Sequence, residues 1–341
     1  MVTETRTRTL NELITRFSNR PHLAEKTRAY YHMVLKHFAW YAAYSRWPQP
    51  EAITREHLRD FLNYVATEEY RWPEAPRSWY KKASQATVHH YGTVVKTFFN
   101  WAEDEEYLPN NPSLRMRLGR PNYREVKPYS DDEVYAMLNV CGEDARLRYR
   151  YLGLRNQAII SLFVATGLRL EELAKISLSD FDPRLQQLQV LGKGRKMRVV
   201  PINGEARKSL KRYLGVRGDG GEALWKSDEG DPLSPYSIQI MIARLKRRAG
   251  VGGGGGPHRF RHYFATKYLE AGGDINSLRL LLGHSTLAMV LKYSRFVDVQ
   301  KALASHEQFN PLDHLYLGRN HNHGWGGRQP WLIGSNYPSG L

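Results

Sequence analysis

The sequence predicts a mainly α-helical protein with a small antiparallel β-sheet, divided into a helical N-terminal domain and a larger mixed α/β domain. Apolar residues recur at helical spacing through the first hundred residues, and a proline-rich segment then ends that pattern. Strand-like alternation follows in one short stretch past the middle of the chain. The chain has 341 residues and is 41% hydrophobic, which is enough to give each of two domains its own core.

The N-terminal domain is expected to consist of helices. Their ranges are 9–19, 24–46, 54–68 and 84–103. The segment after them contains four prolines, so we assign it to an interdomain linker. The expected boundaries are 1–104 for the helical domain, 105–128 for the linker, 129–311 for the second domain and 312–341 for a weakly ordered, glycine-rich tail.

The first half of the second domain mixes helices and strands. Ser130 precedes a helix at 131–140, and an apolar helix runs through 153–166. Two short strands, 187–191 and 197–202, flank a basic glycine-rich turn and are expected to form a hairpin.

Start and stop signals mark the helices of the second half. Ser234 and Pro235 open a helix that ends at Gly250, and Pro257 opens one that closes at Gly272. Asp274 is expected to cap a short helix that ends at Gly283. A further helix is expected to start at Thr286 and to carry Tyr293.

Charge is the strongest compositional signal. The formal net charge of +16 indicates a polyanionic partner, with nucleic acid favoured over an anionic membrane surface. No apolar stretch approaches the length of a membrane span, and the first residues lack the core of a signal peptide, so we expect a soluble, cytoplasmic protein. The single cysteine, Cys141, rules out a disulfide framework and a thiolate zinc site built from this chain alone.

Short segments place phosphate-binding or proton-transfer groups beside tight turns. They are ATGLRLEEL (165–173), GKGRK (192–196), PHRFRH (257–262) and LLGHSTLAMVLKY (281–293). Arginine can bind two oxygens of one phosphate, so Arg169 and Arg261 are candidates to neutralise a phosphorane transition state. Tyr293 can serve as nucleophile and Lys193 as the acid that protonates the leaving oxygen. Histidines in the third and fourth segments can donate to the phosphate or accept the tyrosine proton.

These segments resemble, in order, the motifs of the tyrosine recombinase (phage integrase) family. The matching residues are Arg169 after Thr-Gly-Leu, Glu172 three places later, Lys193 in the hairpin turn, His258 and Arg261 of a His-x-x-Arg pair, His284 after Leu-Gly, and Tyr293 nine residues further. In that family Glu172 would support the catalytic histidines and arginine. The five glycines at 252–256 depart from the family's more varied loop.

The resemblance implies a mechanism and a partner. Tyr293 would attack a scissile phosphate of double-stranded DNA, form a 3′-phosphotyrosyl link and release a 5′-hydroxyl, without ATP, metal or cofactor. The N-terminal domain would be a core-binding domain, and a homotetramer would act on two short core sites in the nucleoid. A simple Xer-like recombinase or a mobile-element integrase fits the two-domain organisation. Whether the reaction is integration, excision or dimer resolution stays open.

Five basic residues are predicted to contact DNA outside the catalytic pocket. Arg244, Lys246 and Arg247 lie at the basic end of the helix that opens at Ser234. By resemblance this helix lies in the major groove, where arginine can bind guanine edges and lysine mostly binds phosphate. Lys82 and Lys96 belong to the N-terminal domain, which by the same analogy closes on the opposite face of the duplex.

Several alternative interpretations remain at this point. The basic hairpin, with Arg195, Lys196 and Arg198, can be a surface that only follows phosphates, although Lys193 is preferred over Lys196 as the acid. His262 is expected to pack rather than catalyse. Three other functions compete: a type IB topoisomerase, a DNA-binding relative without full activity, and a metal-dependent nuclease, which would need clustered acidic ligands. Histidines 314, 321 and 323 lack carboxylate or thiol partners for a metal in the tail.

Overall fold

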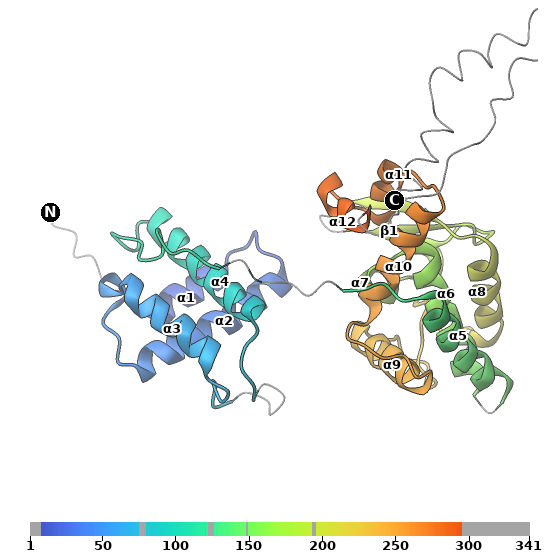
Figure 1. Cartoon of the computed structure of the whole chain (residues 1–341), viewed down its shortest axis with the longest axis horizontal. Coiled ribbons are helices and arrows are strands. Elements are labelled where there is room, and N and C mark those ends of the chain that lie inside the picture. Colours follow the sequence, from blue (N-terminus) through green and yellow to red (C-terminus); the bar gives the residue numbers. More distant parts are fainter. Residues whose placement is uncertain are drawn as a thin grey trace, which may run out of the picture. The chain divides into compact units, whose positions relative to one another are not determined.

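The computed structural model describes residues 8–74, 80–119, 121, 126–147, 149–192 and 196–294. The chain divides into two compact units between Glu125 and Val126 (Figure 1). Within the described residues the regular structure is helical apart from one two-stranded antiparallel sheet. The predicted fold class is therefore confirmed. None of the described helices is long and apolar enough to cross a membrane.

The first unit is a helical bundle. Its elements are α1 (Leu10–Ser18), α2 (Glu25–Tyr44), the 3-10 turn η1 (Pro50–Ala52), α3 (Arg55–Thr67) and α4 (Gln85–Asp104). The side chains of Thr9, Thr54 and Ser84 each accept a hydrogen bond from a backbone N–H in the first turn that follows, which explains where α1, α3 and α4 begin. Aromatic rings fill the core, including Phe17, Phe38, Phe61, Phe98 and Phe99.

The end of this unit differs from the sequence-based boundary. Leu108 and Met116 lie in the segment assigned to the linker, yet only 3% and 6% of their surface is exposed and both belong to the aromatic core. Lys96 Nζ donates to the Met116 carbonyl oxygen at 2.9 Å and holds the same segment against α4. The chain through Met116 therefore packs with the first unit, and the linker begins later than residue 105.

The second unit is built around α6. Its first elements are α5 (Asp131–Arg146), α6 (Arg150–Thr166), α7 (Leu170–Ala174), η3 (Leu178–Asp180), β1 (Gln187–Leu191), β2 (Met197–Pro201) and α8 (Gly204–Arg217). It continues with α9 (Pro235–Arg248), α10 (Pro257–Glu270), α11 (Ile275–Leu282), η5 (Leu287–Met289) and α12 (Leu291–Ser294). Helix α6 contacts α5, α8 and α10, so Ile159, Ile160 and Phe163 are fully buried at the centre (Figure 1).

The predicted hairpin is present. Strands β1 and β2 pair in antiparallel register from Gln187 with Pro201 to Leu191 with Met197. The Gly192 N–H donates to the Lys196 carbonyl oxygen at 2.9 Å, which closes the base of the turn. Residues 193–195, and with them Lys193, lie outside the described residues.

The segment that carries Tyr293 is less regular than the sequence indicates. One helix was expected from Thr286, but the chain forms the 3-10 turn η5 and then the short helix α12. The backbone N–H groups of Met289, Val290 and Tyr293 bond to carbonyls three residues earlier, not four. A 3-10 turn and an α-helix space their apolar residues similarly over so short a segment. Apolar periodicity therefore did not distinguish the two.

Candidate active site

A turn after α6 positions Arg169. Helix α6 ends at Gly167, whose φ of 61° is left-handed, and a Cβ there would lie 2.6 Å from the Phe264 ring. The chain then turns so that Arg169 becomes the N-cap of α7. Its backbone N–H and its Nη1 both donate to the carboxylate of Glu172, each at 2.9 Å. The sequence ATGLRLEEL thus presents an arginine on a short, rigid turn.

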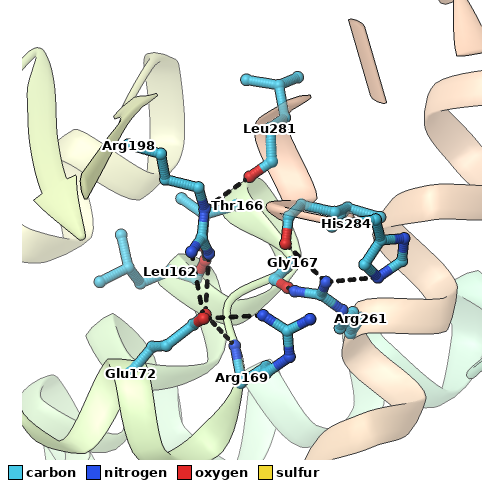
Figure 2. A network of polar contacts seen from close by, with 10 residues as sticks. Leu162, Thr166, Gly167, Arg169, Glu172, Arg198, Arg261, Leu281 and His284 are labelled. Atoms are coloured by element: carbon cyan, nitrogen blue, oxygen red, sulfur yellow. Dashed lines mark hydrogen bonds and ion pairs between the residues drawn. The ribbon is translucent and has the colours of Figure 1, made fainter. Parts of the chain in front are cut away.

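Glu172 is the anion around which this part of the site is organised. Only 7% of its side chain is exposed, and besides Arg169 it binds Arg198, whose Nη1 and Nη2 donate to Oε1 and Oε2 at 3.1 and 2.8 Å. Burial alone would raise the pKa of this carboxyl, but the bonds from Arg198 and from the Arg169 backbone outweigh burial and lower the pKa to about 2. Glu172 is therefore ionised at neutral pH and holds two arginines (Figure 2).

Arg261 is the second predicted arginine, and it is 3% exposed on α10. Its Nη1 donates to the Gly167 carbonyl oxygen, and its Nη2 donates to the Leu282 carbonyl oxygen, both at 2.7 Å. It therefore joins the turn before Arg169 to the end of α11 (Figure 2). Burial, and then the charge of Arg169, lower the pKa of its guanidinium to about 10, so it still carries its charge at neutral pH.

His284 follows α11 directly and contacts Arg261. Its Nε2 lies 2.7 Å from Arg261 Nη2. Since a guanidinium can only donate, Nε2 accepts and the proton of the neutral ring lies on Nδ1. Burial, Arg261 and Arg169 lower the pKa of His284 to about 4, so the ring is neutral. Its Nδ1 is buried and has no hydrogen-bond partner among the described residues.

Tyr293 and His258 complete the set that the structure describes. The Tyr293 ring is 6% exposed and stacks on His284, with ring centroids 6.2 Å apart and planes 12° from parallel. The His262 ring is nearly perpendicular to the Tyr293 ring, with centroids 5.2 Å apart. His258 lies on the first turn of α10 with part of its surface exposed, and its pKa is lowered by partial burial of the ring, by Arg261 and by Arg169. These residues come from α7, α10, the end of α11 and α12, and lie within one region of the second unit.

The predicted DNA contacts lie in different environments. Lys82 is exposed and borders a cavity of about 740 Å³ in the first unit, together with Arg71. Arg244 and Arg247 are exposed on α9, and Arg244 borders a cavity of about 480 Å³ that none of the predicted catalytic residues lines. This second cavity is therefore distinct from the catalytic region.

Lys246 is a correction. It is 8% exposed, and its Nζ donates to the carbonyl oxygens of Gly253 and Gly255 at 3.0 Å each. The ammonium group thus holds the five-glycine loop, and the side chain points into the unit rather than toward a groove. It was grouped with its exposed neighbours because charge alone does not show which face of α9 a lysine occupies.

Arg198 is the residue whose role the sequence analysis missed. It was counted only as part of a basic hairpin surface, but 11% of its side chain is exposed and its partners are Glu172 and, through Nε at 2.9 Å, the Leu281 carbonyl oxygen. A signal was present: in strand β2, residues 198 and 200 share one face, and Val200 is buried. Strand alternation therefore indicated an inward-facing arginine.

Within the ranges that the structure describes, no three or more His, Cys, Asp or Glu side chains are grouped so that they could bind a metal ion. The histidines of the tail lie outside those ranges. Among the described residues, Arg169, Arg198 and Arg261 bring positive charge to this region.

Family models and known proteins match both units. A model described as the phage integrase family matches residues 129–298, and one described as a phage integrase SAM-like domain matches residues 9–117. The chain is 33% identical over 233 residues to tyrosine recombinase XerC of Alcanivorax borkumensis, which covers 67% of this chain and 74% of that protein. It is 31% identical over 272 residues to tyrosine recombinase XerC of Shewanella amazonensis, covering 70% and 90%.

Solved structures show the same fold. A lambda integrase tetramer bound to a Holliday junction superimposes with a TM-score of 0.65 at 20% identity, covering 86% of this chain and 78% of that one. At this identity the likeness concerns the fold. The sequence matches carry the family assignment, and they span both the helical unit and the unit that holds the arginines and Tyr293. The chain therefore belongs to the phage integrase family of tyrosine recombinases.

Proposed function

We propose that this site-specific DNA recombinase cleaves and rejoins DNA strands with Tyr293 as its nucleophile. The observation that carries the proposal is the cluster of Arg169, Arg261 and His284. Two guanidinium groups and one buried, unpartnered Nδ1–H are donors of the kind that stabilise the extra negative charge of a pentacovalent phosphate. The fold fixes the positions of these donors, so they are in place before the negative charge develops on the phosphate.

The proposed reaction balances as a transesterification. The Tyr293 phenolic oxygen attacks phosphorus while its proton passes to a base, for which His258 is the candidate because its lowered pKa keeps it neutral. The bond from phosphorus to the 5′-oxygen breaks, and a 3′-phosphotyrosyl link remains. A 5′-hydroxyl of a partner strand then reverses the step, so the energy of the broken bond is retained and no nucleotide cofactor is consumed.

The leaving 5′-oxygen needs a proton. We propose Lys193 as the donor, in the turn between β1 and β2. Its own position lies outside the described residues, but Gly192 and Lys196 on either side of it are joined by a backbone hydrogen bond. Strand β2, which follows, is attached to Glu172 through Arg198.

Double-stranded DNA is the partner. The net charge of +16 and the exposed Arg244 and Arg247 support binding to its phosphates. We further propose a homotetramer on two short core sites, by analogy with the lambda integrase tetramer bound to a Holliday junction. Strand exchange between two duplexes requires two cleavages in each, which four protomers supply.

A test of the nucleophile uses Tyr293→Phe. With a nicked duplex substrate that traps the covalent intermediate, we expect wild-type protein to form a DNA adduct on denaturing gels. The variant should form none while it binds the same DNA with similar affinity, because only the phenolic oxygen is lost. Tyr135→Phe is the matched control, since Tyr135 is exposed on α5 and is not among the predicted catalytic residues. An adduct at wild-type level in Tyr293→Phe would identify another nucleophile.

A further inference from the structure

Arg198 connects three segments of the catalytic unit. It projects from β2, it binds both carboxylate oxygens of Glu172 on α7, and its Nε donates to the Leu281 carbonyl oxygen at the end of α11 (Figure 2). Three of its five N–H donors are thus bound to protein, and 11% of the side chain is exposed. It is therefore held as a fixed internal cation.

Arg198 and Arg261 bind neighbouring carbonyl oxygens at the end of α11. The carbonyl oxygen of Leu281 accepts from Arg198, and that of Leu282 accepts from Arg261. The next residue, Gly283, has a φ of 64°, and a Cβ there would lie 3.1 Å from Arg198 Nη1. The positive φ favours glycine at this point, and a larger residue would press against the Arg198 guanidinium. Arg198 therefore contacts and supports the turn that carries His284.

The charges in this network give Arg198 a second role. Arg169 and Glu172 form an ion pair with Nη1 and Oε1 2.9 Å apart, and a carboxylate with no other cation would cancel the charge that Arg169 offers to a phosphate. Arg198 binds the same carboxylate by two bonds. The trio of two arginines and one glutamate then keeps a formal charge of +1, whereas the pair alone would have none.

We propose that Arg198 is a positioning residue for strand cleavage: it offsets the carboxylate of Glu172, so that the charge of Arg169 stays available to the scissile phosphate, and it supports the turn that presents His284. This inference rests on the proposed function, since it assumes cleavage by Tyr293 at a phosphate bound by Arg169. It assigns Arg198 no contact with the DNA.

The test follows covalent adduct formation in a single turnover at saturating protein. All variants are assayed at a temperature where circular dichroism shows them folded. Arg198→Met should slow adduct formation roughly 10- to 100-fold, because Arg169 is drawn to an uncompensated carboxylate. Arg198→Lys, which keeps the charge but not the fork, should be intermediate. The exposed Arg184→Met is the control for loss of one positive charge near the same hairpin and should match wild type.

The double variant Glu172→Gln/Arg198→Met separates charge from packing. It removes one negative and one positive charge, so the formal charge of +1 returns while the contacts of Arg198 remain lost. We expect it to recover most of the rate that Arg198→Met loses. If the double variant is as slow as Arg198→Met although both are folded, charge compensation is wrong.

A sulfur substrate separates Arg198 from the general acid. When sulfur replaces the bridging 5′-oxygen, the leaving group departs without a proton. Arg198→Met should be slow on both substrates, because phosphate stabilisation is what it has lost. If the sulfur substrate restores its rate to the wild-type value, Arg198 acts by placing the Lys193 turn, and the proposal is overturned. If the wild-type protein itself forms no adduct that depends on Tyr293, the proposed function fails and takes this inference with it.

Discussion

His284 shows how one contact decides the chemistry of a side chain. Its Nε2 faces the guanidinium of Arg261, and its Nδ1 is buried without a partner in the described part of the chain. Burial disfavours a protonated ring, and the charges of Arg261 and Arg169 add to this, which is why its pKa falls to about 4. The same contact fixes the tautomer, so the free Nδ1–H can serve only as a donor.

This contact predicts a pH dependence of stability. Between pH 6.5 and 4 the unfolded chain binds a proton at His284 that the native protein does not, so the stabilisation is complete above pH 6.5 and is lost as the pH falls toward 4. In His284→Gln, whose amide oxygen can still accept from Arg261, the loss between pH 6.5 and 5.5 should be smaller by on the order of 1 kcal/mol. Urea unfolding of both proteins at several pH values measures this, and parallel curves would contradict it.

A partly buried histidine in the first unit does not affect the comparison of the two proteins. His37 also has its pKa lowered to about 4, by burial, Lys36 and Arg71. Because His37 is present in both proteins, its contribution cancels in the difference between them. The pH-dependent difference then reports on His284.

Among the elements, the five-glycine loop before α10 is held by side chains from its surroundings. Lys246 donates to two of its carbonyl oxygens, and the Arg259 guanidinium donates to the carbonyl oxygens of Gly252, Lys127 and Pro128. Arg259 also pairs with Glu133. These bonds attach the loop to α9 and to the chain that enters α5, so a sequence with little stiffness of its own still presents His258 at a defined place.

Lys246 and its neighbour Arg247 form a matched pair for testing this role. Lys246→Met should destabilise the protein by roughly 1 kcal/mol through lost bonds to the loop, while the salt dependence of DNA affinity stays unchanged. Arg247→Met should leave stability unchanged and reduce the slope of log affinity against log salt by about 1, as expected for one phosphate contact. Thermal unfolding and fluorescence anisotropy measure the two effects. A reduced slope in Lys246→Met would return that lysine to the DNA interface.

Element boundaries were predictable where a local signal defines them. Ser130 caps α5, Asp274 caps α11, and Gly283 ends α11 in the left-handed conformation, as their sequence positions indicated. The motifs likewise indicated which residues to examine in the site. Partners across the fold were not predictable in this way: Glu172 and Arg198 are 26 residues apart, and the packing of β2 beside α11 brings the arginine to that carboxylate. Likewise Leu108 and Met116 join the first core through contacts that proline counting does not show.

For the molecule as a whole, both units carry exposed basic side chains. Arg244 and Arg247 are exposed on the second unit, and Lys81 and Lys82 are exposed on the first. Several of the other cations are committed within the protein, such as Arg198, Lys246 and Arg259. These committed cations are not free to bind phosphate, so the net charge of +16 does not by itself give the number of phosphate contacts.

Salt dependence measures that number. Each phosphate neutralised on duplex DNA releases condensed counterions, so log affinity falls linearly with log salt concentration, with a slope of about −0.9 per contact. If both units bind the duplex through about 6 to 10 phosphates, affinity should fall by roughly 10³- to 10⁵-fold between 50 and 200 mM salt. Lys82→Met should reduce the slope by about 1 if the first unit takes part, and Arg247→Met should do so for the second. A slope that responds to Arg247→Met alone would mean that the second unit supplies the phosphate contacts, and the first unit's share of the charge would then need another partner.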